Sequence, residues 1–410
     1  MSIYQALIVL ISLSAAFSYI NQRFLKLPFV IGLFVVSTTL SLLVLSTKFW
    51  FDIPYNDLKT TVENARINDI ILDYLLGFLL FAGALHTNWQ EIKKQIKAIS
   101  LFALFGVLLS TIIIAVLFFW LTQLFGLDID FVYCLLFGAL ISPTDPIAVL
   151  GILTKANVHK KIESTIVGES LFNDGVGVVL FISIVQILNS KGGDFHFNDF
   201  AGLFVQEAFG GILAGIISGL ILHYFLKKID HYETEVLLTL AFVMGGYFLF
   251  NYVHISGALA MVVMGLMVGN YKTNEAMSDI TEEYIGKFWE LVDVILNAIL
   301  FIIIAFVILL IDFKSTYIYV GILSIFIVLF SRVVVVYFPK LLFPKIIYFT
   351  RKESRLLIWG GLRGGLSIAL VLSLPDNQQK DLLLIATYFC VLFSIIIQGL
   401  TIGKLAENSK

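Results

Sequence analysis

The sequence GESLFNDG occupies residues 168–175, inside a largely apolar stretch from Ile162 to Leu188 that is long enough to cross a bilayer. It places the carboxylates of Glu169 and Asp174 at membrane depth. An ionisable side chain there costs from about 2.5 kcal/mol upward, so such groups are rare and usually mark a route for ions or protons. This segment therefore indicates a membrane protein that moves ions.

The spacing of the polar residues in this segment predicts a polar stripe along one helix. Ser170 and Asp174 are four residues apart and stack on one helical face, while Glu169 and Asn173 stack on the adjoining face. A buried charge must be paired, neutralised or liganded, so each carboxylate needs a partner or a ligand.

The composition excludes a soluble globular domain. Apolar residues make up 59% of the 410, and charged residues only 14%. Stretches near the length of about 20 residues that spans hydrocarbon number about thirteen, which predicts an all-α polytopic membrane protein. They are residues 3–20, 27–46, 70–86, 96–121, 131–154, 162–188, 203–226, 235–250, 255–270, 288–311, 317–337, 355–374 and 382–402.

Basic residues concentrate in alternate loops, which orients the chain. Of the 27 Lys and Arg residues, two (Arg332 and Arg363) lie within spans and all but six of the others fall on one side. The six on the opposite side are Lys48, Lys59, Arg66, Lys191, Lys314 and Lys380. The amino terminus is therefore expected outside and the carboxyl terminus in the cytoplasm, in a multi-pass protein of the inner (cytoplasmic) membrane.

Two spans carry helix-breaking residues. The fifth contains Pro143 and Pro146, and proline removes a backbone donor and clashes with the preceding turn. The carbonyls freed there are expected to be available to a cation. The twelfth contains GGLRGGLS, residues 360–367, with glycines on both sides of Arg363.

The positions of these two breaks predict an internal repeat. They hold the same place in spans one to six and eight to thirteen, which predicts two inverted six-helix units joined by the seventh span. A simple structural kink is the alternative at each break, less favoured where Asp145 lies, because a kink needs no carboxylate.

Four segments together resemble the cation:proton antiporter-1 family, which includes the NhaP-type antiporters and the animal sodium/proton exchangers. They are SPTDPIAVLGIL (142–153), GESLFNDGVGVVLF (168–181), SRVVVVY (331–337) and GGLRGGLSIAL (360–370). The resemblance spans nearly the whole chain and implies the antiporter fold. It also implies a homodimer, in which the single transmembrane domain, 1–410, has a dimerisation part (roughly 1–86 and 203–311) and a mobile core part (roughly 96–188 and 317–402).

The resemblance implies roles for individual residues. Asp174 matches the carboxylate that binds the ion and carries the proton, with Asn173 beside it. Thr144 and Asp145 match the unwound fifth helix, and Ser170 matches a cation-contacting hydroxyl. A sodium ion is therefore expected at Asp174, Ser170, Thr144 and Asp145. The matching positions further imply a structural ion pair between Glu169 and Arg332 and a charge at the second break, Arg363.

Two residues qualify the pattern. Ala82, in LLFAGAL, stands where prokaryotic relatives often have an acidic residue, so a cation ligand or gate component is missing there. Asn297, in ELVDVILNAIL, is expected to hydrogen-bond between helices or to support the core, with direct ion contact the less favoured alternative.

The expected function is exchange of a monovalent cation, sodium or lithium, for protons by alternating access. Because Asn173 supplies an amide and no second titratable charge, exchange of one proton for one cation, without net charge movement, is expected. If Asp145 also exchanged a proton, the stoichiometry would differ from one to one. Potassium/proton exchange stays open as an alternative, and a passive cation channel is less favoured.

Other functional classes fit less well. An intramembrane aspartyl protease would need a tyrosine-aspartate pair and a G-x-G-D segment, where this chain has PTDP and FNDG, so no enzyme activity is expected. No catalytic residue and no cofactor are assigned. The partners expected are monovalent cations, protons, membrane lipid and a second copy of the chain. The net charge of -2 gives no indication of a nucleic-acid partner.

Overall fold

The computed structural model describes residues 3–47, 70–156, 158–189, 197–270, 279–311 and 313–407. All regular structure in these residues is helical. Lys48, Lys59, Arg66 and Lys191, used above to orient the chain, lie outside the described residues.

The first half of the chain contains helices that correspond to the first six predicted spans, several of them with π-helical turns at one end. They are α1 (Ile3–Ile20), η1 (Asn21–Leu25), α2 (Phe29–Thr47), η2 (Ile70–Leu75), α5 (Leu76–Leu85), α6 (Trp89–Ser100), η3 (Leu101–Gly106), α7 (Val107–Leu124), α8 (Phe131–Ile141), α9 (Ile147–Lys155) and α10 (Lys160–Asn189).

The second half contains the helices of the other seven predicted spans. They are α11 (Phe197–Leu226), α12 (Tyr232–Tyr252), α13 (Gly257–Gly269), α14 (Asp279–Phe306), η5 (Val307–Leu310), α15 (Ser315–Leu342), α16 (Arg351–Trp359), α17 (Gly365–Leu372), α18 (Gln378–Phe393), η6 (Ser394–Gln398) and α19 (Gly399–Glu407).

Nine continuous helices in the described residues are long and apolar enough to cross a membrane. Each of the predicted apolar stretches corresponds to helix, so the all-α polytopic prediction is confirmed. Several helices are longer than the stretch that predicted them. The helix at α14 begins at Asp279, nine residues before its apolar run, because its first turns are polar and apolarity alone does not mark them.

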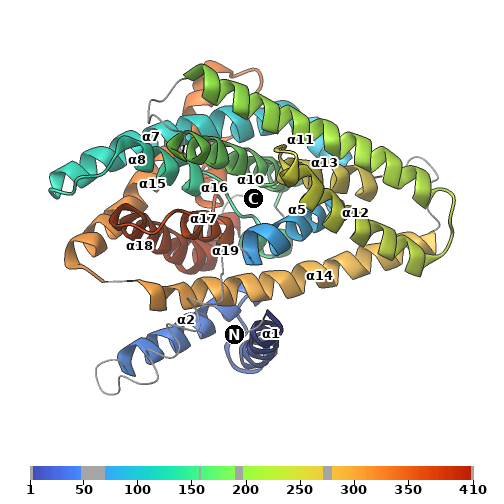
Figure 1. The fold of residues 1–410 in the computed structure, drawn as a ribbon, viewed down its shortest axis with the longest axis horizontal. Helices are drawn as coiled ribbons and strands as arrows, with labels where there is room; N and C mark the ends of the chain where they lie inside the picture. Colours follow the sequence, from blue (N-terminus) through green and yellow to red (C-terminus); the bar gives the residue numbers. More distant parts are fainter. Residues whose placement is uncertain are drawn as a thin grey trace.

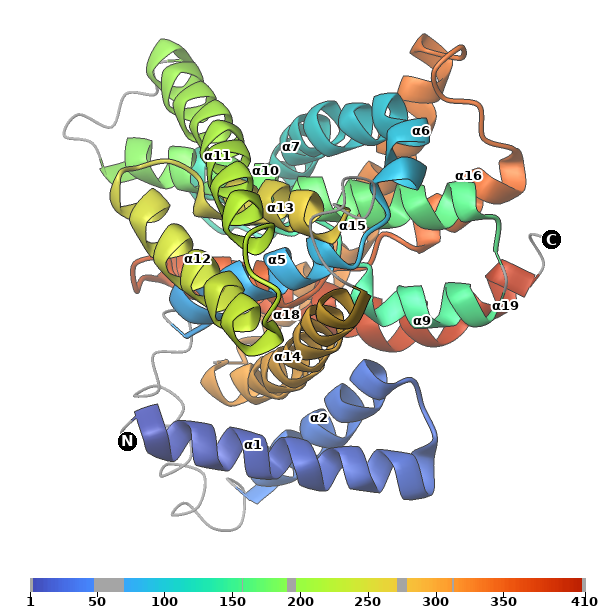
Figure 2. The ribbon, with the colours of Figure 1, turned by 90° about the vertical axis from the view of Figure 1, so that its right-hand side faces the viewer.

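The long helix α14 separates two groups of helices. On one side it packs against α1 and α2, and on the other against α5 and α12. Figures 1 and 2 show the α1/α2 pair outside α14 and the remaining helices on its other face. Helix α10 contacts α6, α8, α11 and α13. The polar stripe of residues 169–174 therefore lies in the middle of the molecule.

The breaks are where the sequence predicts them. In the fifth span α8 ends at Ile141 and α9 begins at Ile147, and in the twelfth α16 ends at Trp359 and α17 begins at Gly365. The two breaks meet, because the backbone N–H of Asp145 in the first donates to the carbonyl of Leu362 in the second, at 2.8 Å. The second extended segment thus supplies a backbone partner to the first, as non-helical backbone at membrane depth requires.

Candidate functional site

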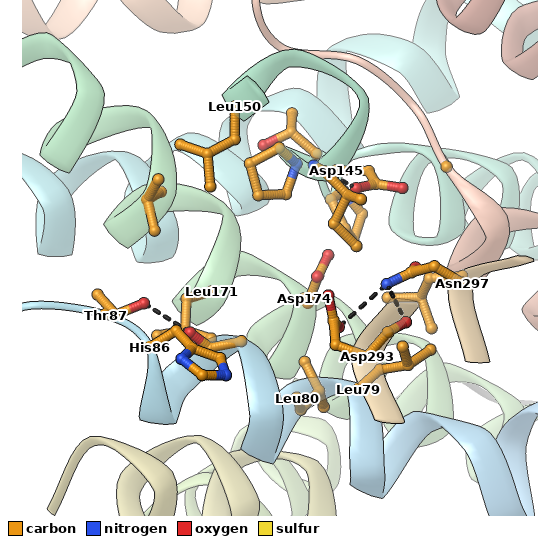
Figure 3. Close-up of a pocket in the computed structure, with 18 of the residues that line it drawn as sticks. Leu79, Leu80, His86, Thr87, Asp145, Leu150, Leu171, Asp174, Asp293 and Asn297 are labelled. Atoms are coloured by element: carbon orange, nitrogen blue, oxygen red, sulfur yellow. Dashed lines mark hydrogen bonds between the residues drawn. The ribbon is translucent and has the colours of Figure 1, made fainter. Parts of the chain in front are cut away.

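A cavity of about 560 Å³ runs from one end of the helices to the broken segments. Its far end is lined by Asp145 and Asp174, while exposed residues, among them His86, Asn88 and Lys160, line its mouth. Figure 3 shows Asp145 and Asp174 facing the space from different elements, with His86 at a distance from them. The mouth lies beside Lys160, at the end of one of the loops whose Lys residues predict the cytoplasmic side.

Asp174 projects from α10 into this cavity. Its side chain is partly buried and makes no hydrogen bond or ion pair with any residue in the described ranges. A carboxylate held inside a membrane protein without a compensating charge must be protonated or bind a cation. Asp174 is therefore the group in the cavity best suited to bind one or the other.

Asp145 lies across the cavity from Asp174, in the first break. Its Oδ1 accepts a hydrogen bond of 2.9 Å from the backbone N–H of Ile147, the first residue of α9. This contact caps the free N–H groups at the start of α9, where the helix dipole favours negative charge. One carboxylate oxygen of Asp145 is thus engaged in holding the half-helix.

Thr144, Ser170 and Asn173 form one hydrogen-bonded group. The Asn173 amide binds Thr144 twice, accepting from its backbone N–H at 3.2 Å and donating to its hydroxyl at 2.9 Å. The Ser170 hydroxyl lies 2.9 Å from the same Thr144 oxygen. Of the three only Thr144 lines the cavity, and Ser170 and Asn173 are buried behind it. In this conformation they fix the position of Thr144.

Arg363 occupies the carbonyls that the first break sets free. Its Nη1 donates to the carbonyls of Ser142 and Pro143, the second at 2.9 Å. These two carbonyls, which are among those expected to be available to a cation, already accept hydrogen bonds from a buried guanidinium in this conformation. Arginine suits this position, since its rigid fork presents several donors together.

Two glycines in the second break let its backbone lie against neighbouring side chains. A Cβ at Gly364 would lie 2.6 Å from Cβ and 2.7 Å from Cγ of Asp145. A Cβ at Gly361 would lie 2.9 Å from Cζ of Arg332. Neither position has room for a side chain. These contacts explain why residues 361 and 364 are glycine, without any need for backbone flexibility at these two positions.

The predicted pair of Glu169 and Arg332 is present in the structure. The guanidinium of Arg332 binds the carboxylate of Glu169 through Nη1 and through Nη2, the latter at 3.0 Å. Arg332 also donates to the carbonyl of Leu357 at 3.0 Å, so it joins α10, α15 and α16. Both charged side chains are buried, at 3% and 6% exposure. Glu169 is fully paired and faces away from the cavity.

Asp293, on α14, also lines the cavity and was not among the residues expected at the site. It hydrogen-bonds Asn297, one turn later on the same helix, at 3.0 Å. The interhelical bond expected for Asn297 is absent from the described contacts, because its amide donates within α14. The signal was in the sequence: Asp293 is an aspartate in an apolar span, the property that singled out Asp174. Ala82 is fully buried and does not line the cavity.

Comparison with known proteins assigns the family. The profile described as sodium/hydrogen exchanger, transmembrane, matches residues 10–408. The chain belongs to the sodium/hydrogen exchanger family. It is accordingly a multi-pass membrane protein of a transporter family, and the expected resemblance is confirmed.

Individual relatives within the family cover almost the whole chain. The Na(+)/H(+) antiporter NhaP of Pseudomonas aeruginosa is 43% identical over 403 residues, which are 97% of this chain and 95% of the relative. The Na(+)/H(+) antiporter NhaH of Halobacillus dabanensis is 35% identical over 85% of this chain and 84% of its own.

A solved antiporter structure has the same fold. The sodium proton antiporter MjNhaP1 of Methanocaldococcus jannaschii, solved at pH 8, superposes with a TM-score of 0.78 and covers 99% of both chains at 21% identity. The antiporter fold predicted from the four segments is thereby confirmed.

Proposed function

We propose that this protein exchanges sodium ions for protons across the membrane, and that Asp174 binds one or the other but never both. The observation that carries the proposal is the carboxylate of Asp174, which has no partner in the part of the chain that the structure describes and lies at the far end of the cavity. The relatives named as Na(+)/H(+) antiporters, at up to 43% identity over 97% of the chain, support the choice of ions.

The cation site contains hard oxygen ligands, which sodium and lithium prefer to softer donors. Asp174 and Asp145 supply carboxylates, and Thr144 supplies oxygen from the wall of the break. Ser170 and Asn173 hold Thr144 in place and become ligands if the break rearranges around the ion. Arg363 neutralises the carbonyl ends of the break without entering the cavity lining.

We propose that the exchange proceeds by alternating access, and the position of the cavity supports this. In this proposal residues 1–86 and 203–311 form one part, which mediates dimerisation, and residues 96–188 and 317–402 form a core that moves. Packing within each part supports the division, for example α5 with α13 and α15 with α18. The cavity is lined by both parts, so movement of the core relative to the other part would expose Asp174 to the opposite side.

We further propose that the exchange is electroneutral. If Asp174 is the only group that changes its occupant, one proton returns for each sodium ion and no net charge crosses. Exchange would then be driven by the two ion gradients alone. We also propose that the protein resides in the cytoplasmic membrane as a homodimer, with its amino terminus outside and its carboxyl terminus inside.

The test is exchange by the purified protein in proteoliposomes, with sodium, lithium and potassium offered in turn. The proposal predicts proton flux with sodium and lithium, abolished by Asp174→Asn. Asp376→Asn, which removes an exposed carboxylate paired with Lys380, is the matched control and keeps the full rate. Exchange with potassium and none with sodium would change the substrate, while normal exchange by Asp174→Asn would refute the mechanism.

The same vesicles test electroneutrality. With sodium and pH equal on both sides, a potential imposed with potassium and valinomycin contributes about 2.3 kcal/mol per elementary charge per 100 mV to any step that moves net charge. A sustained proton flux would show that the exchange is electrogenic, and none is expected.

A further inference from the structure

The wall of the cavity formed by α14 carries a carboxylate and an amide that the proposed exchange at Asp174 does not use. Asp293 and Asn297 both line the cavity, and Figure 3 shows them across the space from Asp145 and beside Asp174. They lie one turn apart on a helix that contributes none of the residues assigned to the exchange at Asp174. Asp293 makes no ion pair with any residue in the described ranges.

The hydrogen bonds of Asn297 fix which way its amide points. Its Nδ2 donates to the backbone carbonyl of Asp293 at 2.9 Å and to the Asp293 carboxylate at 3.0 Å. Both partners are acceptors only, so the nitrogen must be on that side and the oxygen on the other. This oxygen, Oδ1, is buried and has no hydrogen-bond partner among the described residues, in a side chain that is 1% exposed.

A buried amide oxygen without a partner is unusual and calls for a ligand that the protein itself does not supply. Carboxylate and carbonyl oxygens are the ligands that hard cations prefer. Two more carboxylates, Asp145 and Asp174, face the same inner part of the cavity, and a group of like charges concentrates ions of the opposite sign. The chemistry of this wall therefore fits a cation.

The three carboxylates share a cavity but do not converge on one point. Within the described residues, no group of three or more His, Cys, Asp and Glu side chains is arranged to hold one metal ion. Asp293, Asp145 and Asp174 therefore do not surround one ion together, which leaves Asp293 able to hold a cation of its own.

Asp293 lies on a firmly packed part of α14. One turn earlier, Trp289 is fully buried, packs near Phe81 of α5 with ring centroids 4.6 Å apart, and donates to Thr239 at 3.0 Å. The carboxylate thus faces the broken helices from a wall that these contacts hold in position. A cation bound there lies in the same cavity as the carboxylate of Asp174.

We propose that Asp293 and the Oδ1 atom of Asn297 form a second cation subsite, which takes a partly hydrated sodium ion from the cavity before it passes to Asp174. This inference rests on the proposed function, because it assigns a loading step to the same exchange. It gives α14 a direct part in cation capture.

The test compares sodium-dependent exchange by the full-length protein and its variants in proteoliposomes. Asp293→Asn is expected to raise the apparent KM for sodium at least tenfold, with the maximal rate within twofold of the wild type. Asn297→Leu, which removes the amide oxygen at similar volume, is expected to raise it at least threefold. Glu290→Gln is the matched control: it removes an exposed carboxylate three residues from Asp293 that does not line the cavity, and KM should stay within twofold.

The outcomes separate this subsite from the exchange itself. If Asp293→Asn and Asn297→Leu leave KM unchanged, the pair is structural, water satisfies Oδ1, and the subsite is refuted even though wild-type exchange continues. Equal increases in KM for Glu290→Gln and Asp293→Asn would also refute it, because general surface charge would then explain the effect. Should Asp293→Asn not fold, Asn297→Leu decides by the same measurement. Loss of exchange in the wild type would instead contradict the proposed function.

Discussion

At the scale of single residues, the two carboxylates in the middle of α10, Glu169 and Asp174, have opposite surroundings. Glu169 has both oxygens bound by Arg332, whereas Asp174 has no partner among the described residues and faces the cavity. Helical spacing places the two on different faces, and the partner available on each face then decides the role. A paired buried charge has no need of a transported ion, and an unpaired one does.

Removal of the charge of Glu169 from its ion pair with Arg332 should therefore destabilise the folded protein. Glu169→Gln leaves the buried guanidinium of Arg332 without its counter-charge, which is expected to cost about 3 to 5 kcal/mol of stability. We expect a lower thermal unfolding temperature in detergent and a lower yield, with the apparent KM for sodium unchanged in the protein that remains folded. Unaltered thermal stability combined with lost sodium affinity would instead make Glu169 a cation ligand.

At this scale the sequence predicted most of the site. Intramembrane Asp174 and its helical neighbours could be found from hydropathy and spacing, and the family resemblance supplied the pairing of Glu169 with Arg332. Asp293 was not predicted: an aspartate in an apolar span marks it as unusual, but nothing local to α14 shows that it borders the cavity. That fact depends on how α14 packs on α5, which is a property of the tertiary structure.

At the scale of helices, the two breaks form a single structure. Arg363, in the second break, donates to two backbone carbonyls of the first break. The backbone N–H of Asp145, in the first break, donates to a carbonyl of the second break. Proline and glycine predicted where each helix would end. They could not predict that the breaks serve as each other's hydrogen-bond partners, because the two are separated by about half of the chain.

The close approach of the breaks should not tolerate a methyl group. Gly364→Ala places a Cβ within 3 Å of Asp145 Cβ and Cγ, so Asp145 or the break must move. We expect at least about a tenfold loss of exchange rate, since a displacement near 1 Å at a functional site can cost that much or more.

Gly245→Ala is the control for this substitution. Gly245 lies in α12, where a Cβ would meet no neighbouring side chain or other helix within 4 Å in the part of the chain that the structure describes. Alanine is also a better helix former than glycine. The exchange rate of this variant should equal that of the wild type. Normal exchange by Gly364→Ala would show that the geometry of Asp145 is not needed for transport.

At the scale of the whole molecule, the cavity lies between two sets of helices. One wall comes from α5 and α14, and the other from α10, α17 and the break between α8 and α9. The sequence predicted the helices, their order and the broken spans, and thus the fold class. It could not predict the cavity between the two sets of helices, because the cavity depends on their relative position, which hydropathy does not encode.

The central claim is that a proton and a sodium ion compete for Asp174. Acidification adds protons that occupy the carboxylate, so more sodium is needed to displace them, while saturating sodium still restores the full rate. The most direct measurement is the rate of exchange in proteoliposomes against sodium concentration over a series of pH values. We predict that the apparent KM rises on acidification, approaching about tenfold per pH unit for one competing proton, at constant maximal rate. A KM that is independent of pH, with a maximal rate that falls on acidification, would contradict competition at a single carboxylate.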